Sequence, residues 1–100
     1  MSPQAQRKTA VVRMYLRVEN NSKFVRGRKR ARENIERYHL TYYGMKKLDD
    51  GDYELTIPYE NDGDLDRTLH DLLSAISSEA DDRHCFIEAD VYEQGTDRHW

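Results

Sequence analysis

The chain has 100 residues, of which 37% are hydrophobic and 35% are charged. That length suits one domain, and the apolar and aromatic content is too high for a disordered chain. No apolar run approaches the length of a membrane span, and the first residues, MSPQAQRKTA, lack the apolar segment of a signal peptide. Because Cys85 is the only cysteine, no internal disulfide forms, and we expect a cytoplasmic protein with no membrane partner.

The net charge of −3 conceals an asymmetry along the chain. Residues 1–48 hold 13 Lys or Arg and 3 Asp or Glu, a balance of +10, whereas residues 49–100 hold 3 and 16, a balance of −13. This division has two interpretations. Either the first half binds nucleic acid or another acidic partner, or the two halves neutralise each other within the fold.

The first half begins with a flexible polar arm over residues 1–8, followed by a strand and a helix. Residues 9–19 alternate between apolar and polar side chains, as a half-buried strand does. Residues 23–40, KFVRGRKRARENIERYHL, predict a helix over 23–39 that Ser22 or a neighbouring Asn would cap. Its apolar stripe, at spacings of three and four, consists of Phe24, Gly27, Ala31, Ile35 and Tyr38.

Two further strands are expected near residues 41–48 and 53–58, joined by a turn at Asp49-Asp50-Gly51. A three-residue loop with Gly51 in the left-handed region is a favoured hairpin. This register pairs Lys46 with Glu54, Met45 with Leu55 and Tyr43 with Ile57.

The acidic half continues with a helix and a last strand. The helix would begin at an Asp62 or Asp64 cap and run to about Ser78, with an apolar stripe of Leu65, Leu69, Leu72 and Ile76. Residues 83–92, RHCFIEADVY, alternate again, with Cys85, Ile87, Ala89 and Val91 on one side. Residues 95–100 form a polar tail that ends in Trp100.

The resulting order of elements is typical of an α+β protein. It predicts a ferredoxin-like βαββαβ sandwich over residues 9–94, in which two helices cover one face of a four-stranded antiparallel sheet. The apolar faces together predict a core of Val12, Met14, Leu16, Phe24, Ile35, Tyr43, Met45, Leu55, Ile57, Leu69, Leu72, Ile76, Ile87 and Val91. This superfold hosts unrelated functions, so the topology does not assign one.

The other face of the predicted sheet is expected to be open. Its candidate binding residues are Arg13, Tyr15, Arg17, Tyr42, Phe86, Glu88, Asp90 and Tyr92. RNA-recognition domains stack bases on this face, but here the third strand lacks the Lys/Arg-Gly-Phe signature, and Glu88 and Asp90 would repel phosphate. We therefore expect a protein-association surface, for a second copy of the chain or for another protein. An ordinary solvated sheet is the alternative.

The helix over 23–39 offers a second candidate surface, because six of the ten residues from Lys23 to Arg32 are basic. A phosphate-binding patch needs several cations on one exposed face, and its candidate residues are Arg26, Lys29, Arg30 and Arg37. The alternative is that Asp66, Asp71 and Glu79 of the neighbouring acidic helix neutralise these charges.

We expect no catalytic residues, no metal site and no cofactor. The four histidines are scattered, and the sequence has no CxxC or HExxH spacing and no glycine-rich phosphate loop. A metal-dependent nuclease at a dimer interface would resemble the CRISPR-associated adaptation nucleases, which are expected to carry an aspartate where this chain has Glu19 and Asn20. The sequence therefore favours a non-enzymatic interaction or regulatory module that self-associates through the open face. Nucleic-acid binding by the basic helix is the alternative function.

Overall fold

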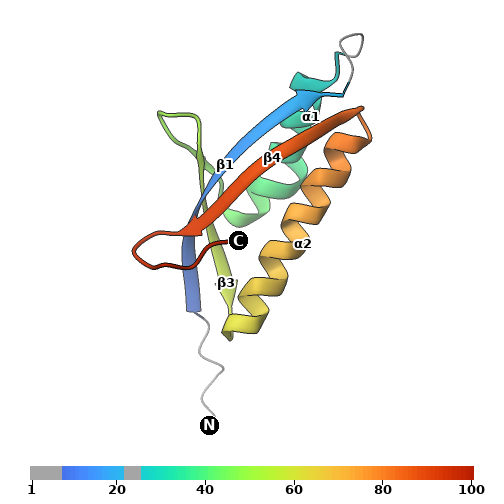
Figure 1. Cartoon of the computed structure of the whole chain (residues 1–100). Coiled ribbons are helices and arrows are strands. Elements are labelled where there is room, and N and C mark those ends of the chain that lie inside the picture. Colours follow the sequence, from blue (N-terminus) through green and yellow to red (C-terminus); the bar gives the residue numbers. More distant parts are fainter. Residues whose placement is uncertain (1–7, 22–25) are drawn as a thin grey trace.

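The computed structural model describes residues 8–21 and 26–100 of the chain. These residues form a sheet of four strands, β1 (Lys8–Asn20), β2 (Lys46–Lys47), β3 (Tyr53–Tyr59) and β4 (Cys85–Glu93), and the main helices α1 (Arg28–Ile35) and α2 (Asp62–Asp81) (Figure 1). A π-helical turn, η1 (Glu36–Leu40), and a 3-10 turn, η2 (Thr41–Tyr43), continue α1. The predicted α+β class is confirmed.

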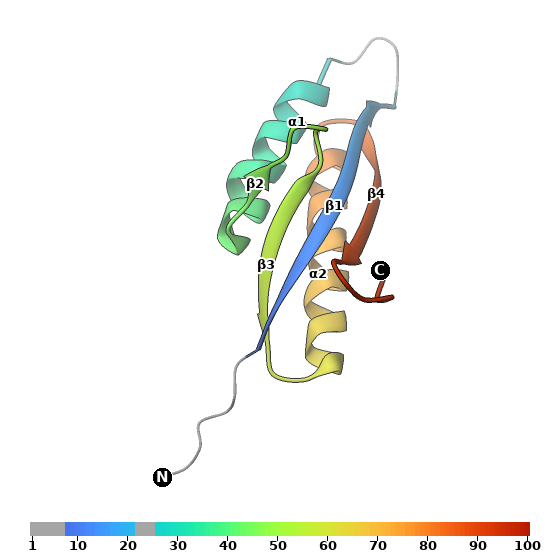
Figure 2. The same cartoon turned by 90° about the vertical axis from the view of Figure 1, so that its left-hand side faces the viewer.

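The strands lie in the order β2-β3-β1-β4, and every neighbouring pair is antiparallel. Figure 2 shows β1 between β3 and β4, with both helices behind the sheet. Lys8–Met14 of β1 pairs with β3, and Val12–Asn20 pairs with β4. After Met14, therefore, the sheet narrows to β1 and β4 alone.

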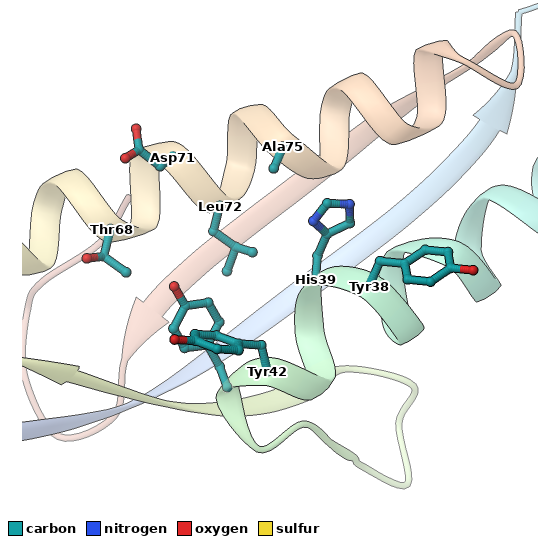
Figure 3. A pocket seen from close by; sticks show the side chains of 8 residues that line it. Tyr38, His39, Tyr42, Thr68, Asp71, Leu72 and Ala75 are labelled. Carbon is teal, nitrogen blue, oxygen red and sulfur yellow. The ribbon is translucent and has the colours of Figure 1, made fainter.

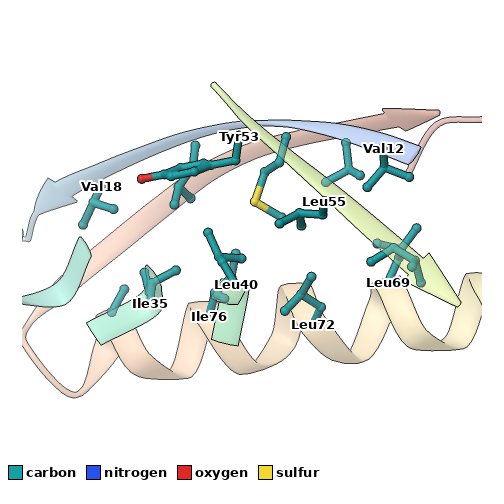
Figure 4. Packing of buried hydrophobic residues seen from close by; sticks show 14 of the residues in the cluster. Val12, Val18, Ile35, Leu40, Tyr53, Leu55, Leu69, Leu72 and Ile76 are labelled. Carbon is teal, nitrogen blue, oxygen red and sulfur yellow. The ribbon is translucent and has the colours of Figure 1, made fainter. Parts of the chain in front are cut away.

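The hydrophobic core lies between the sheet and the helices (Figure 4). The alternation of the strands and the stripes of the two helices correctly predicted these buried residues: Val12, Met14, Leu16, Ile35, Leu55, Ile57, Leu69, Leu72, Ile76 and Val91. Tyr43, Met45 and Ile87 are partly buried against this core. Phe24 lies outside the described residues.

Tyr53 is a fully buried residue that the predicted core lacked, and it ties α1 to the sheet. Its hydroxyl accepts a hydrogen bond from Arg32 Nη1 at 2.7 Å and donates one to Glu36. The other terminal nitrogen of Arg32 donates to the carbonyl oxygen of Leu16 at 2.7 Å. Burial, together with the hydrogen bond to Glu36, raises the pKa of Tyr53 to about 12.

The strand predicted over residues 41–48 is wrong except at Lys46 and Lys47. The chain stays helical through η1 and η2, and Leu40, the last residue of η1, is fully buried. It leaves the helical conformation at Gly44, whose φ of 67° suits a glycine. Lys46 does pair with Glu54 as predicted, but the expected pairings of Met45 and Tyr43 with β3 do not form.

The basic helix also differs from its predicted range of 23–39. It begins at Arg28 and is preceded by Gly27, which makes no side-chain cap. Ser22 and Phe24 lie outside the described residues, and Tyr38 points into solvent instead of extending the apolar stripe. The π-helical turn brings Leu40 into that stripe, five residues after Ile35.

The second helix confirms the predicted stripe, with Ala80 as an additional buried residue. Its cap is Asn61 instead of Asp62 or Asp64, and the Asn61 side chain accepts a hydrogen bond from the backbone nitrogen of Asp64 at 2.9 Å. In residues 8–21 and 26–100, no helix combines the length and apolar character needed to cross a membrane.

Replacing Tyr53 by Phe should lower the free energy of unfolding by about 1–3 kcal/mol, because Arg32 and Glu36 lose their shared partner. The unfolded hydroxyl loses its proton near pH 10, whereas the folded one keeps it to about pH 12. The contribution of Tyr53 is therefore complete below pH 10 and is lost as the pH rises above that value. Urea denaturation at neutral and alkaline pH measures both effects. Tyr42→Phe, at an exposed ring, is the control, and an unchanged midpoint for Tyr53→Phe at neutral pH would contradict the prediction.

Candidate binding surfaces

The face of the sheet turned away from the helices carries alternate residues of β1 and β4. We call it the open sheet face; it consists of Val11, Arg13, Tyr15, Arg17, Glu19, Phe86, Glu88, Asp90 and Tyr92. In the register of the two strands, Tyr15 lies opposite Asp90 and Arg17 lies opposite Glu88. The predicted residues of β1 and β4 are therefore brought together on one surface.

Four large apolar side chains remain partly exposed on this face. Val11, Tyr15 and Tyr92 are each 39% exposed, and Phe86 is 49% exposed. Aromatic rings that are half covered by a rigid sheet are suited to protein contact, since they offer a large apolar area with few rotatable bonds.

The two arginines of the open sheet face have partners within the chain. Arg13 forms ion pairs with Asp50 and, at 3.1 Å, with Asp52, and the hydrogen bond to Asp52 is the main cause of its raised pKa. Arg17 pairs with Glu19 on its own strand, which raises the pKa of Arg17 and lowers that of Glu19. Arg17 is thus not paired with Glu88 across the strands.

Residues 95–100 fold back beside β4 instead of crossing the open sheet face. His99 pairs with Tyr92 in a β-bridge, and its Nε2 lies 2.6 Å from Oδ1 of Asp90. Trp100 donates its backbone N–H to Val91 and its indole N–H to Asp66 of α2. The tail therefore covers the end of an edge strand that would otherwise be free to pair.

Tyr42 does not belong to the open sheet face, and its predicted place there is wrong. It lies in η2 on the helical layer, where its ring is 81% exposed. Its centroid is 4.9 Å from that of Tyr43, and the two rings are nearly perpendicular. Figure 3 shows the Tyr42 and Tyr38 rings on opposite sides of His39, which points toward α2.

The four cations predicted to bind phosphate do not form a single patch. Arg26 and Lys29 line one hollow with Arg28 and Asn20. Arg30 and Arg37 line another, between α1 and the end of α2. The structure therefore brings the predicted residues together in two pairs.

The acidic residues expected to neutralise these cations are not paired with them. Asp66 accepts the hydrogen bond from Trp100, and Glu79 lies 3.1 Å from His39 Nε2 and 3.4 Å from Asn34 Nδ2. Within residues 8–21 and 26–100, Arg26, Lys29, Arg30 and Arg37 form no ion pair. Their charges are therefore available to a ligand.

Arg83 is a further cation that the sequence analysis missed. It follows α2 in the turn before β4 and lines the same hollow as Arg30 and Arg37. Gly27 explains this proximity, because a Cβ atom there would lie only 2.4 Å from the carbonyl oxygen of Arg83. An isolated arginine in the acidic stretch EADDRH was the available signal, but its place beside α1 depends on the fold.

Metal-binding groups and the single cysteine were the remaining candidates for reactive chemistry in the described residues. Nowhere in them do three His, Cys, Asp or Glu side chains lie close enough together to hold a metal ion. Cys85 is buried, and burial raises the pKa of its thiol, which disfavours the nucleophilic thiolate.

Comparison with protein-family models, with curated proteins and with solved structures finds no match to this chain. Its function must therefore be inferred from the chemistry of its surfaces.

Replacing Gly27 by Ala should destabilise the protein by about 1–3 kcal/mol, because the added methyl group meets the Arg83 backbone. Urea denaturation measures the loss, with Gly63→Ala as a matched control whose Cβ would be 3.4 Å from its nearest neighbour, the Asn61 side chain. Equal stability of the two variants would show that α1 does not pack closely on the turn.

Proposed function

We propose that this protein is a non-enzymatic association module that forms a homodimer through its open sheet face. The observation that carries the proposal is the gathering of four partly exposed apolar side chains on one face of a rigid sheet. A two-fold dimer sets such a patch against itself and removes these side chains from water.

The charges of the face are compatible with this self-association. A two-fold axis that runs parallel to the strands, between the two facing sheets, would place β1 of one protomer over β4 of its partner, so that cationic β1 meets anionic β4. Arg17 and Glu88 are the residues proposed to pair across the interface. Arg17 would exchange its pair with Glu19 on its own strand for one with Glu88 of the partner, whereas Arg13 and Asp90 keep their partners in their own chain. Glu88 forms no ion pair with another described residue.

The proposal includes a ferredoxin-like arrangement and a cytoplasmic location. The order of the elements along the chain and the strand order β2-β3-β1-β4 support the first. The single, buried cysteine supports the second.

Phe86→Glu should convert the dimer into a monomer, because it places a charge at the most exposed apolar side chain of the open sheet face. Sedimentation velocity over a wide concentration series measures the change. Tyr42→Glu is the matched control, since it makes the same kind of substitution on the helical layer and should leave the dimer intact. Circular dichroism would verify that both variants fold. A wild-type protein that stays monomeric at the highest concentration contradicts the proposal.

Nucleic-acid binding by the basic residues of α1 and its flanks is a second candidate function. It is favoured by one observation, the absence of ion pairs to Arg26, Lys29, Arg30 and Arg37 within the described residues. Cations that approach phosphates release counterions from the nucleic acid, which favours association at low salt.

If α1 grips a phosphate backbone, Lys29→Gln should weaken binding and should reduce the slope of log affinity against log salt by about one. Fluorescence anisotropy with labelled duplex DNA and single-stranded RNA measures the slope. Arg17→Gln removes one exposed cation from the open sheet face and should change neither quantity. Failure of the wild-type protein to bind either nucleic acid at low salt would exclude this candidate.

A further inference from the structure

A groove between α2 and the α1–η2 segment brings together cations and aromatic rings that the sequence analysis had assigned to different surfaces. At one end Arg30, Arg37 and Arg83 line a hollow of about 570 Å³. At the other end Tyr42 and Tyr43 line a hollow of about 280 Å³. Tyr38 lines both, so the two hollows adjoin at this residue. We call this continuous surface the helix groove.

The cationic end of the helix groove is equipped to bind anions. None of its three arginines forms an ion pair with a residue in 8–21 or 26–100. Glu79, which also lines this end, is held by His39 and Asn34. Glu33 is the one carboxylate here without such a partner among the described residues. Positive charge therefore prevails, and phosphate is the ligand whose geometry matches several arginines.

The aromatic end offers two rings to a flat partner. Tyr42 is 81% exposed and Tyr38 is 61% exposed, the largest exposures of any large hydrophobic residue in the described part of the chain. Asp71 stands at this end and would repel a phosphate, but its carboxylate can accept hydrogen bonds from the amino groups of a base. The chemistry thus places phosphates at the arginines and bases at the tyrosines.

We propose that the helix groove binds single-stranded nucleic acid, with phosphates against Arg30, Arg37 and Arg83 and unpaired bases stacked on Tyr38 and Tyr42. The proposal rests on the second candidate function and specifies its ligand. Proteins that bind single strands combine a cationic groove with aromatic side chains in this way. Eight residues separate Arg30 from Tyr38, about 12 Å of helix, which is the length of roughly three stacked nucleotides.

A duplex fits this groove less well than a single strand. Bases within a duplex are stacked on each other, so their faces are not available to Tyr38 or Tyr42. The phosphates of a duplex would still be attracted to the arginines, but without the aromatic contribution. The proposal therefore requires a preference for the single strand in addition to salt-dependent binding.

The test is fluorescence anisotropy of the full chain with a short labelled oligodeoxycytidine and with the same strand paired to its complement. We expect tighter binding of the single strand, and about tenfold weaker binding of it by Tyr42→Ala. Tyr42→Phe keeps the stacking ring and should bind like the wild type. Arg83→Glu should weaken binding, whereas Glu33→Gln should strengthen it, because it removes the free carboxylate from the cationic end. Tyr15→Ala and Arg17→Gln on the open sheet face serve as matched controls and should change nothing.

The outcomes separate this proposal from the others. Equal affinity for strand and duplex, with no effect of Tyr42→Ala, would overturn the groove while leaving the basic-helix candidate standing. Loss of binding to both ligands would overturn the two together. Full competition by inorganic triphosphate, or equally tight binding of a polyglutamate peptide, would also overturn it by showing that only anions are recognised. Normal binding by a monomeric Phe86→Glu variant would support a site that does not depend on the open sheet face.

Discussion

The position of α1 on the sheet depends on one buried hydroxyl group, that of Tyr53. A buried polar group has to find hydrogen-bond partners, and this one finds Arg32 and Glu36, which are four residues apart at the end of α1 and the start of η1. Two contacts one turn apart fix the rotation of a helix about its own axis. With Arg32 and Glu36 directed to the sheet, Arg30 and Arg37 are left on the outer side. The same interaction that anchors the helix therefore exposes its remaining cations.

The opposite charges of the two halves meet at the sheet rather than between the helices. Arg13 pairs with the acidic β2–β3 turn, and Lys46 lies 3.8 Å from Glu54 on the neighbouring strand. Lys47 reaches Glu36 at 3.1 Å and so connects β2 to the Tyr53 cluster. Exposed pairs of this kind contribute little to stability, but they hold the turn against β1. Asp66 and Glu79 of α2 have other partners, and the charges of Lys29 and Arg30 in α1 remain available.

The alternation of apolar residues in the strands and their spacing in the helices were enough to predict the main strands, the main helices and most of the core. The alternation of β1 placed Val12, Met14 and Leu16 inside, and the spacing in α2 did the same for Leu69, because each burial follows from local geometry. The same approach predicted the wrong structure for the segment after Leu40. A short run with two tyrosines fits a strand as well as a helix. In the structure the chain stays helical through a π-helical turn, which places Leu40 in the core.

The candidate surfaces show the same limit. The open sheet face followed from the alternation of β1 and β4, apart from Tyr42, whose place depends on where the helix ends. The helix groove could not be predicted, because it requires Arg83 to lie beside α1. That contact depends on Gly27 passing close to a turn more than fifty residues further along the chain. Sequence periodicity carries no information on such a contact, since Arg83 belongs to no repeating pattern and the stripe that includes Gly27 does not specify what packs against it.

The two proposed surfaces lie on opposite sides of the molecule, so one does not obstruct the other. The open sheet face belongs to the strands, and the helix groove belongs to the layer behind them (Figure 2). A dimer joined through the sheets would carry one groove on each outer side. A nucleic-acid strand long enough to reach both grooves would then bind the second one at a high effective concentration, whereas a short strand would gain nothing. Self-association would thus make the affinity for a nucleic-acid strand depend on the length of that strand. The open sheet face would then influence binding without contacting the ligand.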